Sequence, residues 1–227
     1  MSNAQPLPAE PWAPPGKVAG YAIAACAALS IMMIAMHPQA AQHRMSEVVA
    51  EIGRLALMLA VVHGTLIAFV IVLAYGLAVY SLRRGLRREL VVGALVVYAA
   101  GVGVMVPAAL IDGFVIPAVA RTYVGASPEV LRNGAGILVA CSAAIQVLTK
   151  FGVVAFSVAI TLWSADLVRD GARARIVAII GFAAAVISLV VLFGAGRFIV
   201  PLTLSVIVLA EGIWYIAVAS LLVQERV

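Results

Sequence analysis

Two ionisable residues of opposite sign stand far from any other charge in this chain. Lys150 is the only charged residue within positions 133–165, and Glu211 is the only one within positions 198–224. Both stretches are otherwise apolar enough to cross a bilayer, and an ionised side chain at its centre costs at least about 2.5–3.5 kcal/mol. We therefore expect Lys150 and Glu211 to face each other, as an ion pair or as a neutral pair that shares a proton. Such a pair would serve proton exchange or would be a structural tie between two helices.

A stripe of polar residues accompanies the lysine along the same predicted helix. Its members recur at spacings typical of one helix face, and they are Ser142, Gln146, Thr149, Lys150, Ser157, Thr161 and Ser164. A stripe of this length predicts a polar cavity, with Gln146 and Ser157 lining a path beside the charge pair. The alternative is that the hydroxyl and amide groups only hold neighbouring helices together.

A histidine and an aspartate are candidates for the outer end of that path. His63 lies near one end of an apolar run, in VVHGTL, and Asp112 ends another. Asp112 shares a helix face with Tyr98, Gly101, Met105 and Ala108. We expect Asp112 to meet His63 and orient its imidazole, so that the two form an outer gate.

The stretch IMMIAMHPQAAQHRM, residues 31–45, is rich in methionine and histidine. Thioether and imidazole ligands suit Cu(I), and two histidines can hold a haem. The candidate metal ligands are His37, His43, His63, Met33 and Met36. The alternative is that methionine fills gaps at a helix end. We expect no cofactor, with haem or copper as the alternative.

Composition limits the class of protein. The 227 residues are 65% hydrophobic and 11% charged, whereas a soluble domain usually carries about 25% charged residues. The net charge of +5 comes from basic residues in short segments between apolar runs, which indicates contact with membrane lipids rather than nucleic acid. Cys26 and Cys141 lie in apolar runs and show no metal-binding spacing. Phosphate-loop, zinc-protease, serine-hydrolase and dinucleotide motifs are absent from the sequence, and no catalytic residue is predicted.

Six apolar runs have the length of a membrane-spanning helix, about 20 residues. Because the runs are continuous rather than alternating, they predict an all-α integral membrane bundle of six transmembrane helices rather than a barrel. The expected helices are residues 18–36, 55–80, 90–111, 135–163, 175–195 and 198–222. Residues 1–16 form a predicted Pro-rich tail, and residues 17–227 form one membrane domain. The longer connections, 37–54 and 112–134, are expected to form a small outer-side cap, with helix starts at Ser46 and at Ser127-Pro128-Glu129 ahead of the apolar runs.

The distribution of lysine and arginine predicts the orientation of the bundle. Nine basic residues fall on the side that holds both chain ends and five on the other, so both ends are expected to be cytoplasmic. Arginine outnumbers lysine by 13 to 2, which is typical of a GC-rich bacterial source and indicates the bacterial inner membrane.

Three function hypotheses follow from these patterns. The first is a multi-pass inner-membrane protein whose buried ionisable pocket binds a small or amphiphilic solute and couples its transport to protons. The second is a haem- or copper-binding membrane protein that handles electrons or metal. The third is a non-catalytic membrane scaffold or accessory subunit. The sequence predicts neither the substrate nor the oligomeric state.

Overall fold

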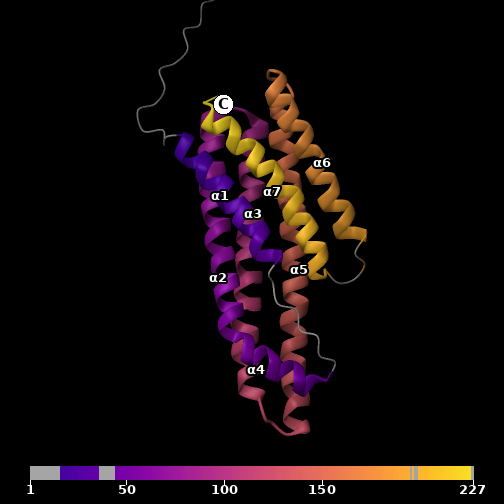
Figure 1. Ribbon diagram of the computed structural model, residues 1–227. Helices are drawn as coiled ribbons and strands as arrows, with labels where there is room; N and C mark the ends of the chain where they lie inside the picture. Colours follow the sequence, from indigo (N-terminus) through magenta and orange to yellow (C-terminus); the bar gives the residue numbers. More distant parts are fainter. Residues whose placement is uncertain (1–15, 36–43, 195, 197–198, 226–227) are drawn as a thin grey trace, which may run out of the picture.

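The computed structural model describes residues 16–35, 44–194, 196 and 199–225, and no strand occurs among them. The elements in chain order are α1 (Gly16–Ala35), α2 (Met45–Arg84), α3 (Glu89–Leu110), the π-helix η1 (Ile111–Val115), α4 (Ile116–Tyr123), α5 (Pro128–Leu167), α6 (Ala172–Gly194) and α7 (Pro201–Val223) (Figure 1). In these ranges six helical spans are long and apolar enough to cross a membrane, with α3, η1 and α4 forming one of them. The all-helical fold and the six expected spans are confirmed.

The two long connections contain helix outside the apolar runs. α2 begins at Met45 and α5 at Pro128, next to the helix starts expected at Ser46 and at Ser127-Pro128-Glu129. The Ser127 side chain caps α5, as predicted, by accepting a hydrogen bond from the backbone N–H of Val130. Residues 37–43, and residues 1–15 of the predicted tail, lie outside the described residues.

The six spans form a closed ring in the order in which they occur in the chain. α1 contacts α2, α2 contacts α3, and α3 contacts α5. α5 then contacts α6, α6 contacts α7, and α7 packs back against α1. In Figure 1 the indigo α1 and the yellow α7 run next to each other, so the first and last spans close the ring.

The helices of this ring have two different lengths. α2 and α5 have 40 residues each, which corresponds to about 60 Å, or twice the thickness of the hydrocarbon layer of a bilayer. α1, α6 and α7 have 20 to 23 residues, which is enough to cross it once. The extra length of α2, α5 and the continuous α3–η1–α4 segment gathers at the end that carries α4 (Figure 1). We call this part the three-helix extension. Val49, Ile116, Ala120 and Leu138 are buried at its centre.

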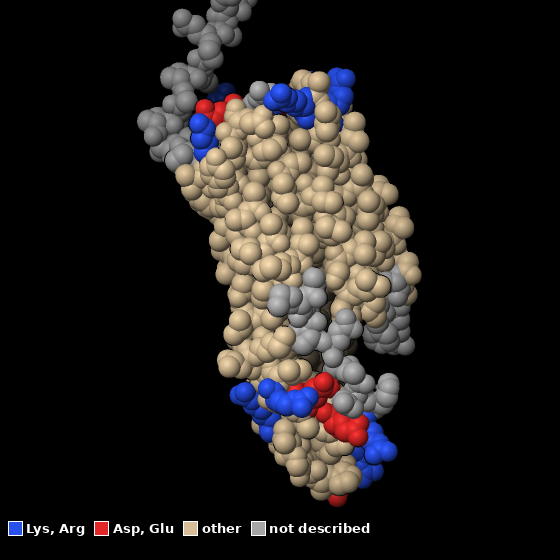
Figure 2. Space-filling view, in the orientation of Figure 1, with Lys and Arg blue, Asp and Glu red and all other residues tan. Residues whose placement is uncertain are grey.

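The outer surface of the bundle suits a lipid environment. Leu57, Phe193 and Leu202 are 74%, 74% and 73% exposed, which would be unfavourable in water for a cluster of such side chains. On the face shown in Figure 2, charged side chains gather toward the two ends, and the band between them contains none that is visible. A lipid-facing belt between two polar ends is the surface that a multi-pass membrane protein requires.

An aromatic cluster fills the ring toward the end where α2 and α5 finish. The indoles of Trp163 and Trp214 stack with centroids 5.8 Å apart, and Tyr98 stacks on Phe156 at 4.7 Å. Tyr98 also meets Tyr215 edge to face at 6.4 Å. Because these rings come from α3, α5 and α7, the cluster fixes the spacing of three spans.

The same end holds four paired charges, which we call the arginine–aspartate cluster: Arg84, Arg88, Asp166 and Asp170. The Arg84 guanidinium donates through Nε to Asp166 at 2.8 Å, through NH2 to the same carboxylate, and through NH1 to Asp170. Arg88 donates to Asp166 from 3.2 Å. The side chains of Arg84 and Asp166 are only 6% and 8% exposed, so this cluster is a buried clamp between the ends of α2 and α5.

Candidate functional site

A cavity of about 170 Å³ lies inside the helix ring. Residues of α1, α2, α3, η1, α5 and α7 line it, and they are mostly aliphatic or aromatic. Along α3 and η1 the lining residues run from Tyr98 to Asp112, which corresponds to about 20 Å of helix. The cavity is therefore long and narrow, and it is parallel to the helices rather than across them.

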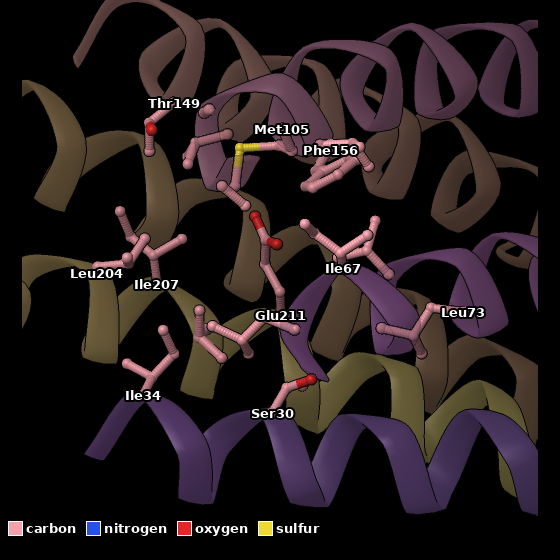
Figure 3. A pocket seen from close by; sticks show the side chains of 18 of the residues that line it. Ser30, Ile34, Ile67, Leu73, Met105, Thr149, Phe156, Leu204, Ile207 and Glu211 are labelled. Carbon is pink, nitrogen blue, oxygen red and sulfur yellow. The ribbon is translucent and has the colours of Figure 1, made fainter. Parts of the chain in front are cut away.

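Glu211 of α7 projects into this apolar space. Figure 3 shows its carboxyl group reaching into the cavity toward Met105, with Ile67 and Ser30 beside it. The residue is only 5% exposed, and its buried Oε1 has no hydrogen-bond partner among the described residues, although the Ser188 hydroxyl of α6 lies close to the carboxyl group. A buried acceptor without a partner costs about 1–3 kcal/mol, and a carboxylate without a counter-charge costs more. Glu211 is thus the one acidic group in the middle of the cavity, and a proton or a ligand donor would stabilise it.

His63 and Asp112 meet at one end of the cavity, and both side chains line it. His63 Nε2 lies 3.1 Å from Asp112 Oδ2, and His63 Nδ1 lies 2.9 Å from the carbonyl oxygen of Leu59. Because a carbonyl only accepts, Nδ1 carries a hydrogen. Nε2 and the carboxyl group then hold one further proton between them, as imidazolium with carboxylate or as imidazole with carboxylic acid.

The contact between these two side chains depends on a glycine. A β-carbon at Gly113 would lie 2.4 Å from Cβ of His63, so only glycine lets η1 approach α2 this closely. The His63 side chain is 7% exposed, whereas that of Asp112 is 37% exposed. The pair therefore connects the buried cavity with the surface at this end of the bundle. The sequence-based expectation that His63 and Asp112 meet agrees with this geometry.

Lys150 and Gln146 do not line the cavity that contains Glu211. The reason is the rotation of the helix. Thr149 faces the cavity, and the next residue lies about 100° further around the axis. The pairing of Lys150 with Glu211 stays a prediction.

The amide of Gln146 binds the backbone just before α7. It donates to the carbonyl of Ile199 at 3.2 Å and accepts from its N–H at 2.8 Å. Ser157, the other predicted path residue, is fully buried but does not line the cavity, and its Oγ has no hydrogen-bond partner among the described residues. The polar stripe of α5 is therefore divided between several neighbours, and only Thr149 of the predicted set lines the cavity.

Sequence reasoning missed two contributions to the site. Tyr215 lies four residues after Glu211, so the two share one face of α7, and both line the cavity. This spacing was a usable signal. The second contribution is that of α1, which brings Ala27, Ser30 and Ile34. Nothing in its sequence marks these small and aliphatic residues as cavity-lining.

The predicted metal ligands lie largely outside the part of the chain that is described. Met36, His37 and His43 fall in the gap between α1 and α2, and Met33 is partly buried on α1. His63 contacts Asp112 and Leu59. Across the described ranges no group of three or more His, Cys, Asp or Glu side chains is arranged to hold a metal ion. The haem and copper hypothesis stays a prediction.

Comparison of the chain with known protein families, with curated proteins and with solved structures finds no match.

Proposed function

We propose that this chain is a multi-pass protein of the bacterial inner membrane whose central cavity binds a small amphiphilic solute and carries it across the membrane in exchange for a proton. The single observation that supports this is the unpartnered carboxyl oxygen of Glu211 inside an apolar cavity. A group that served only packing would be more favourable as an apolar side chain. The carboxyl group is suited to a partner that enters and leaves.

Proton exchange at Glu211 follows from the same environment. With the cavity empty, the neutral carboxylic acid avoids an unpaired charge in an apolar space. A ligand that brings a positive or strongly polar group makes the carboxylate favourable, and the proton leaves. Binding of solute and binding of proton at Glu211 therefore exclude each other, which is the property that an exchanger needs.

The remaining titratable groups of the cavity lie on α2, α3, η1 and α7. They are His63, Tyr98, Asp112 and Tyr215, and among the described residues none from α1 or α5 lines it. The His63–Asp112 pair holds one proton and lies at the end that connects with the surface, which suits an outer gate. With the arginine-rich end in the cytoplasm, this gate opens to the outside.

The test follows occupancy of the cavity itself rather than partition into lipid. The protein is labelled with ¹³C-methyl methionine in nanodiscs, and benzyl alcohol is the probe. Met105 lines the cavity, whereas Met58 of α2 is 43% exposed and lies outside it. Saturable shifts of the Met105 resonance without matching shifts of Met58 are expected.

A matched pair of substitutions separates the cavity from the lipid-facing surface. Val208 lines the cavity, and Val206 on the same helix is 36% exposed and does not. Val208→Trp is expected to abolish the saturable shift, and Val206→Trp to leave it unchanged. In proteoliposomes with a trapped pH dye, solute-driven proton movement should disappear in Val208→Trp and Glu211→Gln. If Met105 never responds in the wild-type protein, the cavity is not a binding site, and the scaffold hypothesis takes its place.

A further inference from the structure

The charged groups that line the cavity favour a solute of one sign of charge. Two carboxyl groups line it, those of Glu211 and Asp112, together with one histidine that is bonded to Asp112. No lysine or arginine lines the cavity among the described residues. An anionic solute would find repulsion and no cationic partner at the middle of the cavity. A cation would find an unpartnered carboxyl oxygen.

The walls beside Glu211 favour a cation of a particular kind. Tyr98, Phe156 and Tyr215 line the cavity, and the ring of Tyr98 lies 4.7 Å from Phe156 and 6.4 Å from Tyr215. Aromatic faces attract organic cations, and more strongly where water is excluded. Tyr215 follows Glu211 by one helical turn, so the carboxyl group and this group of aromatic rings are neighbours.

The number of polar groups limits the ligand to one charged centre. Besides Glu211 and the His63–Asp112 pair, the polar groups that line the cavity are the hydroxyls of Ser30, Thr149, Tyr98 and Tyr215, which can accept further hydrogen bonds; Figure 3 labels Ser30 and Thr149. The rest of this region is aliphatic, with Ile67 and Ile207 among the nearest side chains in the view. A primary ammonium donates three hydrogen bonds, and its apolar body can lie along the cavity.

We infer that the cavity selects a small organic monoamine in its ammonium form, a single positive group on an apolar body, with Glu211 as its counter-ion. This inference rests on the proposed function and specifies the class of solute. The same lining excludes solutes with several separated positive charges, and it excludes anions. Each of them would bury a charge that has no partner in the cavity.

The test compares three probes of nearly equal shape: benzylamine, benzyl alcohol and benzoate. Their dissociation constants are measured from the saturable Met105 methyl shift, with Met58 as the reference for partition into lipid. In the wild-type protein, benzylamine should bind at least about tenfold more tightly than benzyl alcohol, because a charge-assisted hydrogen bond replaces a neutral one. Benzoate should produce no saturable shift.

Substitution of the carboxyl group provides the second arm. Glu211→Gln should reduce the preference for the amine over the alcohol to about one, because the shape is kept and the charge is lost. Glu89→Gln is the matched control, since Glu89 is exposed at the start of α3 and does not line the cavity. It should keep the full preference.

The outcomes separate the two proposals. If benzyl alcohol or benzoate binds wild-type protein as tightly as benzylamine, the inferred ammonium selectivity is wrong while the cavity remains a binding site. If none of the probes shifts Met105, the proposed function is wrong as well. Should Glu211→Gln not fold, the comparison of the three probes in the wild-type protein still decides the question.

Discussion

The molecule buries carboxyl groups in two regions and treats them in opposite ways. In the arginine–aspartate cluster, Asp166 is 6% exposed and accepts hydrogen bonds from both Arg84 and Arg88. In the central cavity, Glu211 is 5% exposed and its Oε1 has no partner among the described residues. The first arrangement stabilises the ends of two helices. The second leaves a costly group unsatisfied in a space with room for a ligand, which is what a binding site requires.

The largest expected effect is on the arginine–aspartate cluster. Arg84→Met should lower the free energy of unfolding by about 3 kcal/mol or more, because Asp166 and Asp170 lose their shared partner in a buried position. Unfolding in mixed micelles measures this. The control is Arg87→Met, since Arg87 is exposed and one residue from Arg88. A loss of stability in both variants would show that net charge, not the pairing, matters here.

Substitution of the cavity carboxyl group by methionine should change the free energy of unfolding in the opposite direction. Glu211→Met is expected to raise the free energy of unfolding by about 1–3 kcal/mol, because it replaces an unpartnered buried polar group with an apolar side chain. The same assay measures it, and benzylamine binding should be lost. Destabilisation comparable to that of Arg84→Met would mean that Glu211 is a structural group, and the contrast between the two regions would disappear.

The contribution of the His63–Asp112 pair to stability should be intermediate between these two. A double-mutant cycle with His63→Phe and Asp112→Asn is expected to give a coupling energy of about 0.5–1 kcal/mol, a modest value because the Asp112 side chain is 37% exposed. Chemical denaturation of the four proteins supplies the cycle. A coupling energy near zero would remove the argument that the pair holds a shared proton at the end of the cavity.

The smallest effect is expected on ligand affinity when Lys150 is substituted. Because this residue does not line the cavity, Lys150→Met should change the affinity for benzylamine by no more than about twofold. Thr149→Val, one residue earlier and in the lining, is the comparison variant and should weaken binding more. If Lys150→Met removes the preference for benzylamine over benzyl alcohol as Glu211→Gln should, the charge pair expected from the sequence forms during the working cycle.

Hydropathy predicted the six spans because a run of about 20 apolar residues has few alternatives in a bilayer. On α3 the spacing of Tyr98, Gly101, Met105, Ala108 and Asp112 predicted one shared face, and all of them except Gly101 line the cavity. The sequence did not predict rotation about the axis where several faces carry polar residues. On α5 the stripe is wide enough that Thr149 faces inward while Gln146 binds the backbone before α7.

The arginine–aspartate cluster was missed for a related reason. Its four residues lie in or beside the short basic segments between apolar runs, where the positive-inside rule accounts for charge without a partner. The signal that could have identified it is the coincidence of acidic and basic residues at two helix ends on the same side of the membrane. The starts of α2 and α5 outside the apolar runs were predicted by helix-start signals at Ser46 and Ser127-Pro128-Glu129 and not by hydropathy, because hydropathy marks the apolar core of a helix, not its ends.

The closed helix ring also bears on how the protein is made. α1 packs against both α2 and α7, so the ring is complete only when α7 has left the ribosome and inserted. Glu211 belongs to α7. Its carboxyl group therefore reaches the bilayer after the spans that surround it have been synthesised, and it can move directly into an existing protein interior. Shortening the chain before α7 would remove the carboxyl group and one wall of the ring together.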